Sequence, residues 1–360
     1  MTNLPLTTKQ LVDNLTTILN GLTALKVLKI EIISPDDHVV CSPVNIPFLN
    51  CSCRDSFASS LTELDLKLSV EDLPSIMGST SDRGTQGRSN SEILPNLEIL
   101  RLTLEQADKS TLGDPLIASP LVFLISGCGR KLHTISLNTG RGLNPSTGLL
   151  EHVSKSGIKF PLLSTLRLRQ FYRSATTDFT RLLHFLKDHA GSTRHLQFHL
   201  TVEDASNLPS GEIFFSHPMF TQIPLPLLEH LEMEFYYFPS DYLPHMVPFL
   251  ARSPQLRFLA IDSGHERWSS ANLSTLVQCL KVPDPASSIQ VSRAFNGLTY
   301  LELRLEIFRA SVLSLIYEGL PCLEILRLHF FTVSPVGYGN IHDVFVPLVS
   351  PSSSAGYWKL

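Results

Sequence analysis

The chain is poor in cysteine and has no surplus of basic charge. Six cysteines are scattered over 360 residues, too sparsely for the disulfide framework of a small secreted domain, so we expect reduced thiols. Lysine and arginine number 29 against 33 acidic residues, and the net charge is −4. A general nucleic-acid-binding surface would require a basic excess. The composition therefore predicts no nucleic-acid partner.

Targeting and membrane signals are also missing. The N-terminal segment MTNLPLTTKQ has no basic stretch followed by an apolar one, which a secretion signal would need. The longest apolar run, around residues 116–126, is too short to cross a bilayer. We therefore expect no membrane partner and a cytoplasmic or nuclear location.

Catalytic and cofactor motifs are absent from the sequence as well. The chain contains no Walker pattern, GxGxxG, GxSxG or HExxH. One loop holds an H-x2-C-x9-C-x-C cluster, but C-x-C is a poor spacing for tetrahedral zinc. The residues of this cluster are His38, Cys41, Cys51 and Cys53. His184 and His189 are five apart and share a helical face poorly. We expect no enzyme activity, no cofactor and no metal.

What the chain does have is one pattern, LxxLxLxL, ten times from end to end. The second-last aliphatic residue of each copy serves as a marker, and the markers are Leu28, Leu64, Leu100, Ile135, Leu166, Leu196, Leu231, Leu259, Leu301 and Leu326. Their mean spacing is 298/9, about 33 residues. The residue two positions after each marker is also apolar, which is the alternation of a half-buried strand. Ten copies at such a period predict stacked repeats.

Segments with helical spacing lie between these strands. Residues 177–189, 240–251, 270–280 and 309–318 carry apolar stripes, and capping or stop signals mark further helices near 8–20, 114–125 and 144–157. Strands that alternate with helices require a parallel sheet with crossovers. The sequence therefore predicts an α/β, irregular leucine-rich-repeat solenoid of about ten repeats, with a parallel concave sheet and helices on the convex side.

The repeats predict one domain over residues 1–331, with loop insertions at 34–56 and 78–92 and a C-terminal tail or cap at 332–360. The asparagine that usually forms a hydrogen-bonded ladder after the strand is missing. We therefore expect an irregular arc held mostly by leucine packing.

The strand residues between the buried leucines predict a binding face. Two outward positions per repeat give twenty residues, of which nineteen are polar and the exception is Ala260. Basic side chains dominate repeats three to six, and acidic side chains dominate repeats seven and eight. This distribution favours a partner of complementary charge. The candidate partner-binding residues are Arg101, Arg167, Arg169, Gln197, His199, Glu232, Glu234, Asp262, Glu302 and Arg304. Ordinary solvated side chains on an open sheet are the alternative.

The signature LPxLExLxL at 94–102, 225–233 and 320–328 resembles the leucine-rich regions of fungal F-box-type proteins, in the ribonuclease-inhibitor-like group. Such proteins dock on the Skp adaptor of a cullin ubiquitin ligase through an F-box, while the repeats select the substrate. An F-box would occupy about the first fifty residues as a helical module beginning near LPxE. Here Leu4-Pro5 is followed by Leu6-Thr7, which does not match LPxE, and the first repeat strand has begun by Leu28. We therefore recognise no F-box.

Together these features predict a non-catalytic scaffold that binds a protein partner of unknown identity on its concave face. The alternatives are a substrate-recognition subunit of a cullin-type ligase, with the Skp adaptor as partner, and an enzyme, which the missing motifs disfavour. Nucleic-acid binding would need the Arg101–Arg169 stripe to show a steep dependence of affinity on salt.

Overall fold

A computed structural model describes fourteen stretches of the chain. They are residues 21–31, 58–69, 94–105, 124–125, 127–128, 130–139, 153, 159–172, 180–202, 224–236, 243–262, 270–280, 297–308 and 310–333. The chain divides into two compact units: unit 1 runs to residue 192 except for 174–176, and unit 2 runs from residue 193. The cysteine cluster, both predicted loop insertions, the helix predicted over 8–20 and all but the start of the predicted tail lie outside the described residues. Of the helices predicted near 114–125 and over 144–157, only residues 124, 125 and 153 are described, and all three are helical.

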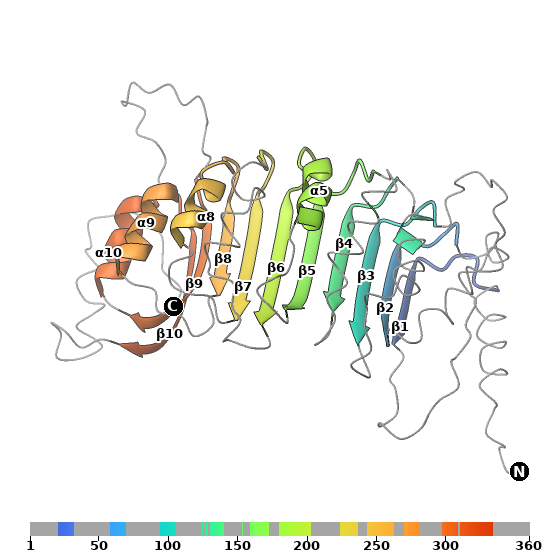
Figure 1. Ribbon diagram of the computed structural model, residues 1–360, viewed down its shortest axis with the longest axis horizontal. Helices are drawn as coiled ribbons and strands as arrows, with labels where there is room; N and C mark the ends of the chain where they lie inside the picture. Colours follow the sequence, from blue (N-terminus) through green and yellow to red (C-terminus); the bar gives the residue numbers. More distant parts are fainter. Residues whose placement is uncertain are drawn as a thin grey trace, which may run out of the picture. The chain divides into compact units, whose positions relative to one another are not determined.

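Unit 1 holds five parallel strands that pair in chain order (Figure 1). They are β1 (Val27–Glu31), β2 (Glu63–Ser69), β3 (Ile99–Glu105), β4 (Thr134–Thr139) and β5 (Thr165–Tyr172), followed by helix α5 (Thr180–His189).

Unit 2 repeats this arrangement with five further parallel strands, also paired in chain order. Its elements are β6 (His195–Val202), β7 (His230–Tyr236), α8 (Leu243–Leu250), β8 (Phe258–Asp262), α9 (Ser270–Leu280), β9 (Tyr300–Phe308), α10 (Ala310–Gly319) and β10 (Ile325–Val333). Strand β10 therefore runs two residues past the predicted end of the repeats.

The repeat leucines form the core of each unit. The markers pair with one another across neighbouring strands, as in Leu64 with Leu100 and Leu259 with Leu301. Eight of the ten markers are at most 1% exposed, whereas those of the two terminal strands, Leu28 and Leu326, are more open. An end strand lacks one neighbour, so its inner side chains are covered from one side only. The predicted fold class is confirmed: each unit is a stack of α/β leucine-rich repeats.

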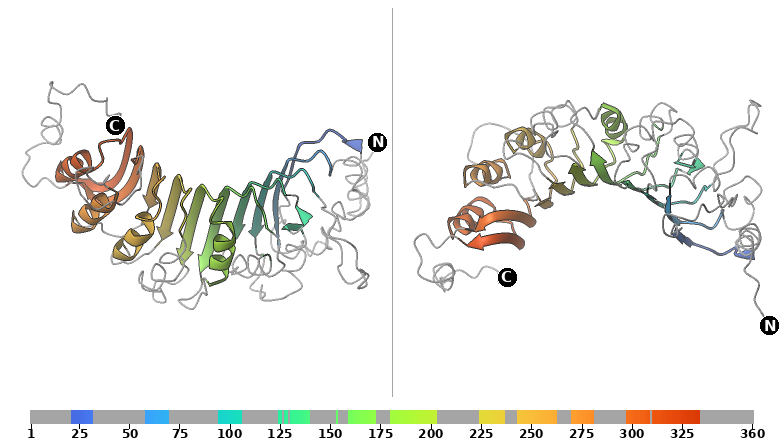
Figure 2. Two further views of the ribbon diagram at one scale, coloured as in Figure 1. Left: turned by 90° about the horizontal axis from the view of Figure 1, so that it is seen from above. Right: turned by 60° about the horizontal axis from the view of Figure 1, so that its bottom comes forward.

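The predicted helices also agree with the structure where it describes them. Helix α9 has the predicted bounds, and α5, α8 and α10 lie within three residues of theirs. Helix α9 buries Leu273, Leu276, Val277 and Leu280, the stripe expected of an amphipathic helix. Figure 2 shows α8, α9 and α10 on one side of the unit 2 strands. The other side of that sheet is therefore the outward face.

A backbone ladder joins successive repeats in addition to leucine packing. Just before each strand, one carbonyl accepts two N–H groups from the next repeat; for example, Lys26 O accepts from Thr62 N at 2.8 Å and Glu63 N at 3.0 Å. The other carbonyls are those of Thr62, Glu98 and His133 in unit 1, and Arg194, Glu229, Arg257 and Thr299 in unit 2. These bonds satisfy the backbone where each strand begins, without the missing asparagines.

In the part of the chain that the structure describes, no helix has both the length and the apolar character needed to cross a membrane.

Candidate binding surface

The outward face of each unit consists of three parallel rows of side chains, because neighbouring strands are in register. In unit 2 the start row is His195, His230, Phe258, Tyr300 and Ile325; the middle row is Gln197, Glu232, Ala260, Glu302 and Arg327; and the end row is His199, Glu234, Asp262, Arg304 and His329. The middle and end rows agree with the outward positions predicted from the sequence, whereas the start row was not among them. The same period-2 alternation, extended one step before each marker, would have found it.

The start row of unit 2 is a stack of rings. The His230 and Phe258 ring centroids lie 3.7 Å apart with planes 8° from parallel, and those of Phe258 and Tyr300 lie 4.0 Å apart at 13°. His195 joins at 5.6 Å from His230, and the Arg327 guanidinium lies 5.5 Å from the Tyr300 centroid. Because the rings cover one another's faces, they present mainly their edges outward. Such a stack is a rigid apolar strip.

Glu302 has contacts with three side chains on this face. It accepts a short hydrogen bond from the Tyr300 hydroxyl, and His329 Nε2 lies 2.9 Å from its other oxygen. Arg327 approaches to 3.8 Å. Partial burial and this bond to Glu302 raise the pKa of Tyr300 to about 12, so the phenol stays protonated and continues to donate.

A second network surrounds His199 in the end row. Its Nδ1 lies 2.5 Å from Glu234 Oε2 and its Nε2 lies 3.5 Å from Glu232 Oε1, while His230 Nε2 lies 3.8 Å from the other Glu232 oxygen. Hydrogen bonds to Glu232 and then to Glu234 raise the pKa of His199 to about 9. Bonds from His199 and His230 lower the pKa of Glu232 to about 2. At neutral pH His199 is therefore an imidazolium between two carboxylates.

Gln197 lies beside this imidazolium, with its amide nitrogen Nε2 placed 2.7 Å from His199 Nε2. A half-turn of the amide exchanges that nitrogen for the oxygen. When both ring nitrogens carry protons, the amide oxygen is the group that can accept there. Farther along the end row, Arg304 donates to both oxygens of Asp262, at 3.0 and 3.3 Å.

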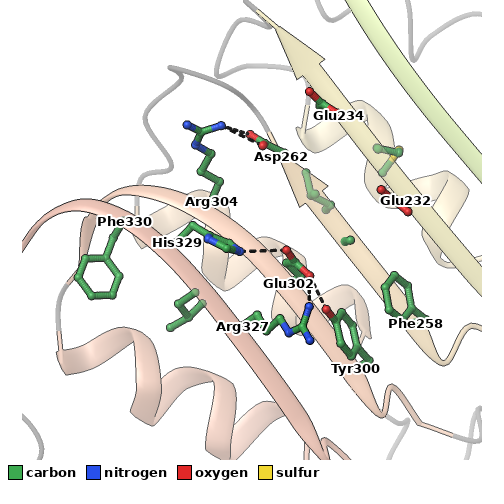
Figure 3. A pocket seen from close by; sticks show the side chains of 14 residues that line it. Glu232, Glu234, Phe258, Asp262, Tyr300, Glu302, Arg304, Arg327, His329 and Phe330 are labelled. Atoms are coloured by element: carbon green, nitrogen blue, oxygen red, sulfur yellow. Dashed lines mark hydrogen bonds and ion pairs between the residues drawn. The ribbon is translucent and has the colours of Figure 1, made fainter. Parts of the chain in front are cut away.

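These rows surround a hollow of about 1020 Å³ over β7 to β10 (Figure 3). Five of the ten predicted site residues line it: Glu232, Glu234, Asp262, Glu302 and Arg304. Phe258, Tyr300, Arg327 and His329 also line it, and they were not among the ten candidates. Gln197 and His199 lie beside it on β6.

The remaining three candidates lie on the outward face of unit 1. Arg101 forms a short ion pair with Glu63, a start-row residue that the sequence analysis did not place on this face. Arg167 and Arg169 are exposed on β5. Unit 1 also carries a cross-strand pair between Lys67 and Glu31 at 2.5 Å. Arg101 is thus paired, and Lys29, Arg167 and Arg169 are exposed basic side chains on this face.

The described histidine that is most buried, His189 in unit 1, has a structural role. Its Nδ1 lies 2.8 Å from the Phe185 carbonyl oxygen and its Nε2 accepts from the Phe160 N–H at 3.2 Å. Desolvation lowers the pKa of His189 below its usual value. A neutral ring with one donor and one acceptor satisfies both bonds. The ring also packs between Phe160 and Phe185.

Within the described stretches, no group of three or more His, Cys, Asp or Glu side chains could hold a metal ion. The described cysteines, Cys128, Cys279 and Cys322, carry free thiols. Burial raises the pKa of Cys128 far above its usual range and that of Cys279 to about 11, so these two thiols are poor nucleophiles.

Comparison with known proteins finds matches among solved structures. No protein-family model matches the sequence, and no curated protein matches it. Among solved structures, TLR13 in its complex with ssRNA13 is 13% identical over 78% of this chain and 40% of that chain, with a TM-score of 0.29. An internalin (inlF) from Listeria monocytogenes is 15% identical over 92% of this chain and 90% of its own, with a TM-score of 0.33. The chain thus spans two-fifths of the TLR13 chain. At these TM-scores neither likeness bears on the site.

Proposed function

We propose that this chain is a non-catalytic protein-interaction scaffold that binds a protein partner through the outward faces of its strands. The observation that carries the proposal is the hollow over β7 to β10, where charged side chains border a rigid strip of stacked rings. Interfaces are enriched in aromatic and arginine side chains held in fixed positions. The exposed Arg167 and Arg169 supply planar donors that can bind a partner's carboxylates bidentately.

The proposal is tested by reversing charge on one face at a time. The outward-face variant combines Arg167→Glu, Arg169→Glu and Arg327→Glu, which changes three exposed arginines. The opposite-face control combines Lys187→Glu on α5 with Glu318→Lys on α10, both exposed. Tagged full-length chains are purified from the cells that express the natural protein, and captured proteins are quantified by mass spectrometry.

We expect the outward-face variant to lose a specific partner by at least tenfold, because interfacial arginines are common anchors. The control should keep that partner, and melting temperatures should stay within about 2 °C, since exposed ion pairs contribute little to stability. Loss of the partner from the control but not from the outward-face variant would place binding on the helices and refute the proposal.

A second candidate function is substrate recognition for a cullin-type ubiquitin ligase, and the LPxLExLxL signature favours it. Its test is direct: the purified chain is mixed with purified Skp adaptor and passed over a sizing column. Co-elution at equimolar ratio supports this role, and separate elution supports the plain scaffold.

A further inference from the structure

The middle row of unit 2 is interrupted at Ala260. Register pairs Ala260 with Glu232 of β7 on one side and with Glu302 of β9 on the other. Neighbouring strands lie about 4.8 Å apart, so the two glutamate Cα atoms are separated by about 10 Å. Ala260 is 8% exposed, so neighbouring side chains cover most of it, and it lies at the floor of the hollow. Because alanine has no side chain beyond Cβ, the middle row is one side chain short between two carboxylates; we call this interruption the gap.

The two ends of this gap are also defined. Asp262 follows Ala260 by two residues on the same face, and Phe258 precedes it by two. The Phe258 ring is clamped between His230 and Tyr300 at 3.7 and 4.0 Å. The gap therefore has three carboxylates and one fixed aromatic edge around an apolar floor.

The cations that contact the two glutamates approach them from outside the gap, whereas Asp262 is already bonded to Arg304 of β9. Glu302 contacts His329 and Arg327 of β10, on the side away from β8 (Figure 3). Glu232 contacts His199 of β6 and His230 of its own strand. Strand β8, which forms the floor, contains no basic residue (FLAID). A carboxylate has about four lone-pair positions, so both glutamates keep acceptor capacity toward the gap.

The charged side chains that line the hollow also favour a basic ligand. Four carboxylates line it against two guanidinium groups and the His329 ring. A long basic side chain fits both parts of the gap, because its apolar stem can pack along a ring edge and an alanine methyl while its charged end reaches the carboxylates.

We infer that the gap over Ala260 receives one lysine or arginine side chain of a protein partner. This inference rests on the proposed function and makes it more specific: the partner segment that enters the unit 2 hollow is basic at the point of contact.

The Ala260 methyl group is a direct probe of this gap. The full-length chain is labelled with ¹³C at alanine methyls, and the Ala260 signal is assigned by its loss in Ala260→Ser. The ligand is the pentapeptide acetyl-Gly-Gly-Arg-Gly-Gly-amide, and the matched control replaces arginine by citrulline, which has nearly the same shape without the charge. We expect a saturable shift of the Ala260 signal with the arginine peptide at millimolar concentration.

The citrulline peptide should leave the Ala260 signal in place, and Glu232→Gln with Glu302→Gln should weaken the response to arginine at least fivefold. Equal shifts with both peptides, or an undiminished shift in the double variant, would overturn the inference. The single variants Glu232→Gln and Glu302→Gln provide the same readout if the double variant does not fold.

Partner capture gives an independent readout. Ala260→Lys places an ammonium group of the chain itself in the gap, so it should reduce capture at least tenfold, whereas Ala260→Ser should retain it. If Ala260→Lys captures the partner normally while the outward-face variant does not, the inference is wrong and the proposed function stands. If neither variant affects capture and the opposite-face control does, both fail.

Discussion

The two units share one strand pattern but carry different chemistry on their outward faces. In unit 1 the three rows hold five cations against three carboxylates, and the start row has no aromatic residue. In unit 2 two arginines face four carboxylates, four histidines join them, and the start row is a ring stack. The buried leucines are nearly interchangeable between the units. This contrast indicates that core positions specify the fold, whereas outward positions are available for recognition.

The units also use histidine in opposite ways. His189 in unit 1 is buried and neutral, with both ring nitrogens satisfied by backbone groups. His199 in unit 2 is held charged by two carboxylates. One ring contributes to packing and the other to an electrostatic network, because their neighbours differ.

The largest expected difference in stability between the two units comes from substituting a glycine. Gly297, just before β9 in unit 2, has φ of +82°, and an added Cβ would lie 2.7 Å from the Cβ and Sγ of Cys322. Gly297→Ala should cost about 2–4 kcal/mol, from backbone strain together with the clash. Its control in unit 1 is Gly191→Ala, where an added Cβ meets nothing within 4 Å. Chemical denaturation measures the free energy of unfolding of both variants. Equal losses of stability would show that the backbone at Gly297 is not constrained.

A smaller effect should appear in the pH dependence of stability, with opposite signs for the two histidines. The folded-state pKa of His189 is lowered, so its contribution is complete above about pH 6.5 and decreases as the pH falls below that value. The pKa of His199 is raised to about 9, so its contribution is complete below about pH 6.5 and is lost as the pH rises through 9.

The raised pKa of His199 should contribute about 1 kcal/mol, after allowance for solvent screening of its partly exposed network. For His189 the prediction is the sign, a loss of stability toward acid pH. The measurement is the free energy of unfolding between pH 5 and 9.5 for the wild type and for His199→Gln and His189→Gln. His199→Gln should flatten only the alkaline side of the profile, and His189→Gln only the acidic side. An unchanged alkaline side in His199→Gln would contradict the charged state assigned to this ring.

The smallest expected effect lies among the arginines of unit 1. Arg101→Met removes the partly buried pair with Glu63 and should cost about 0.2–1 kcal/mol in low salt, decreasing toward zero at about 1 M salt as the pair is screened. Arg167→Met changes a more exposed side chain and should be neutral within about 0.5 kcal/mol. Thermal melts at the two salt concentrations compare the variants. A larger loss of stability in Arg167→Met would mean that Arg167 makes a stabilising interaction on β5.

Much of the fold could be predicted because it depends on local periodicity. Ten copies of one aliphatic pattern predict parallel strands, and stripes such as Leu273, Leu276 and Val277 predict helices between them. The site was predictable only in part. Alternation placed Glu232 and Glu302 on one face, but their partners, such as Arg327 and His199, come from other repeats about 25 to 35 residues away in the sequence.

The sequence by itself determined the repeat, the buried positions and the residues that face outward, because those follow from a period of two along each strand. The tertiary structure decided which outward side chains meet. It paired Arg101 with Glu63, placed the His199 ring between Glu232 and Glu234, and stacked Phe258 on Tyr300. The physical reason is that the aligned markers fix which backbone positions lie side by side. Side-chain rotamers decide which groups touch, and each rotamer depends on all of its neighbours in the folded chain.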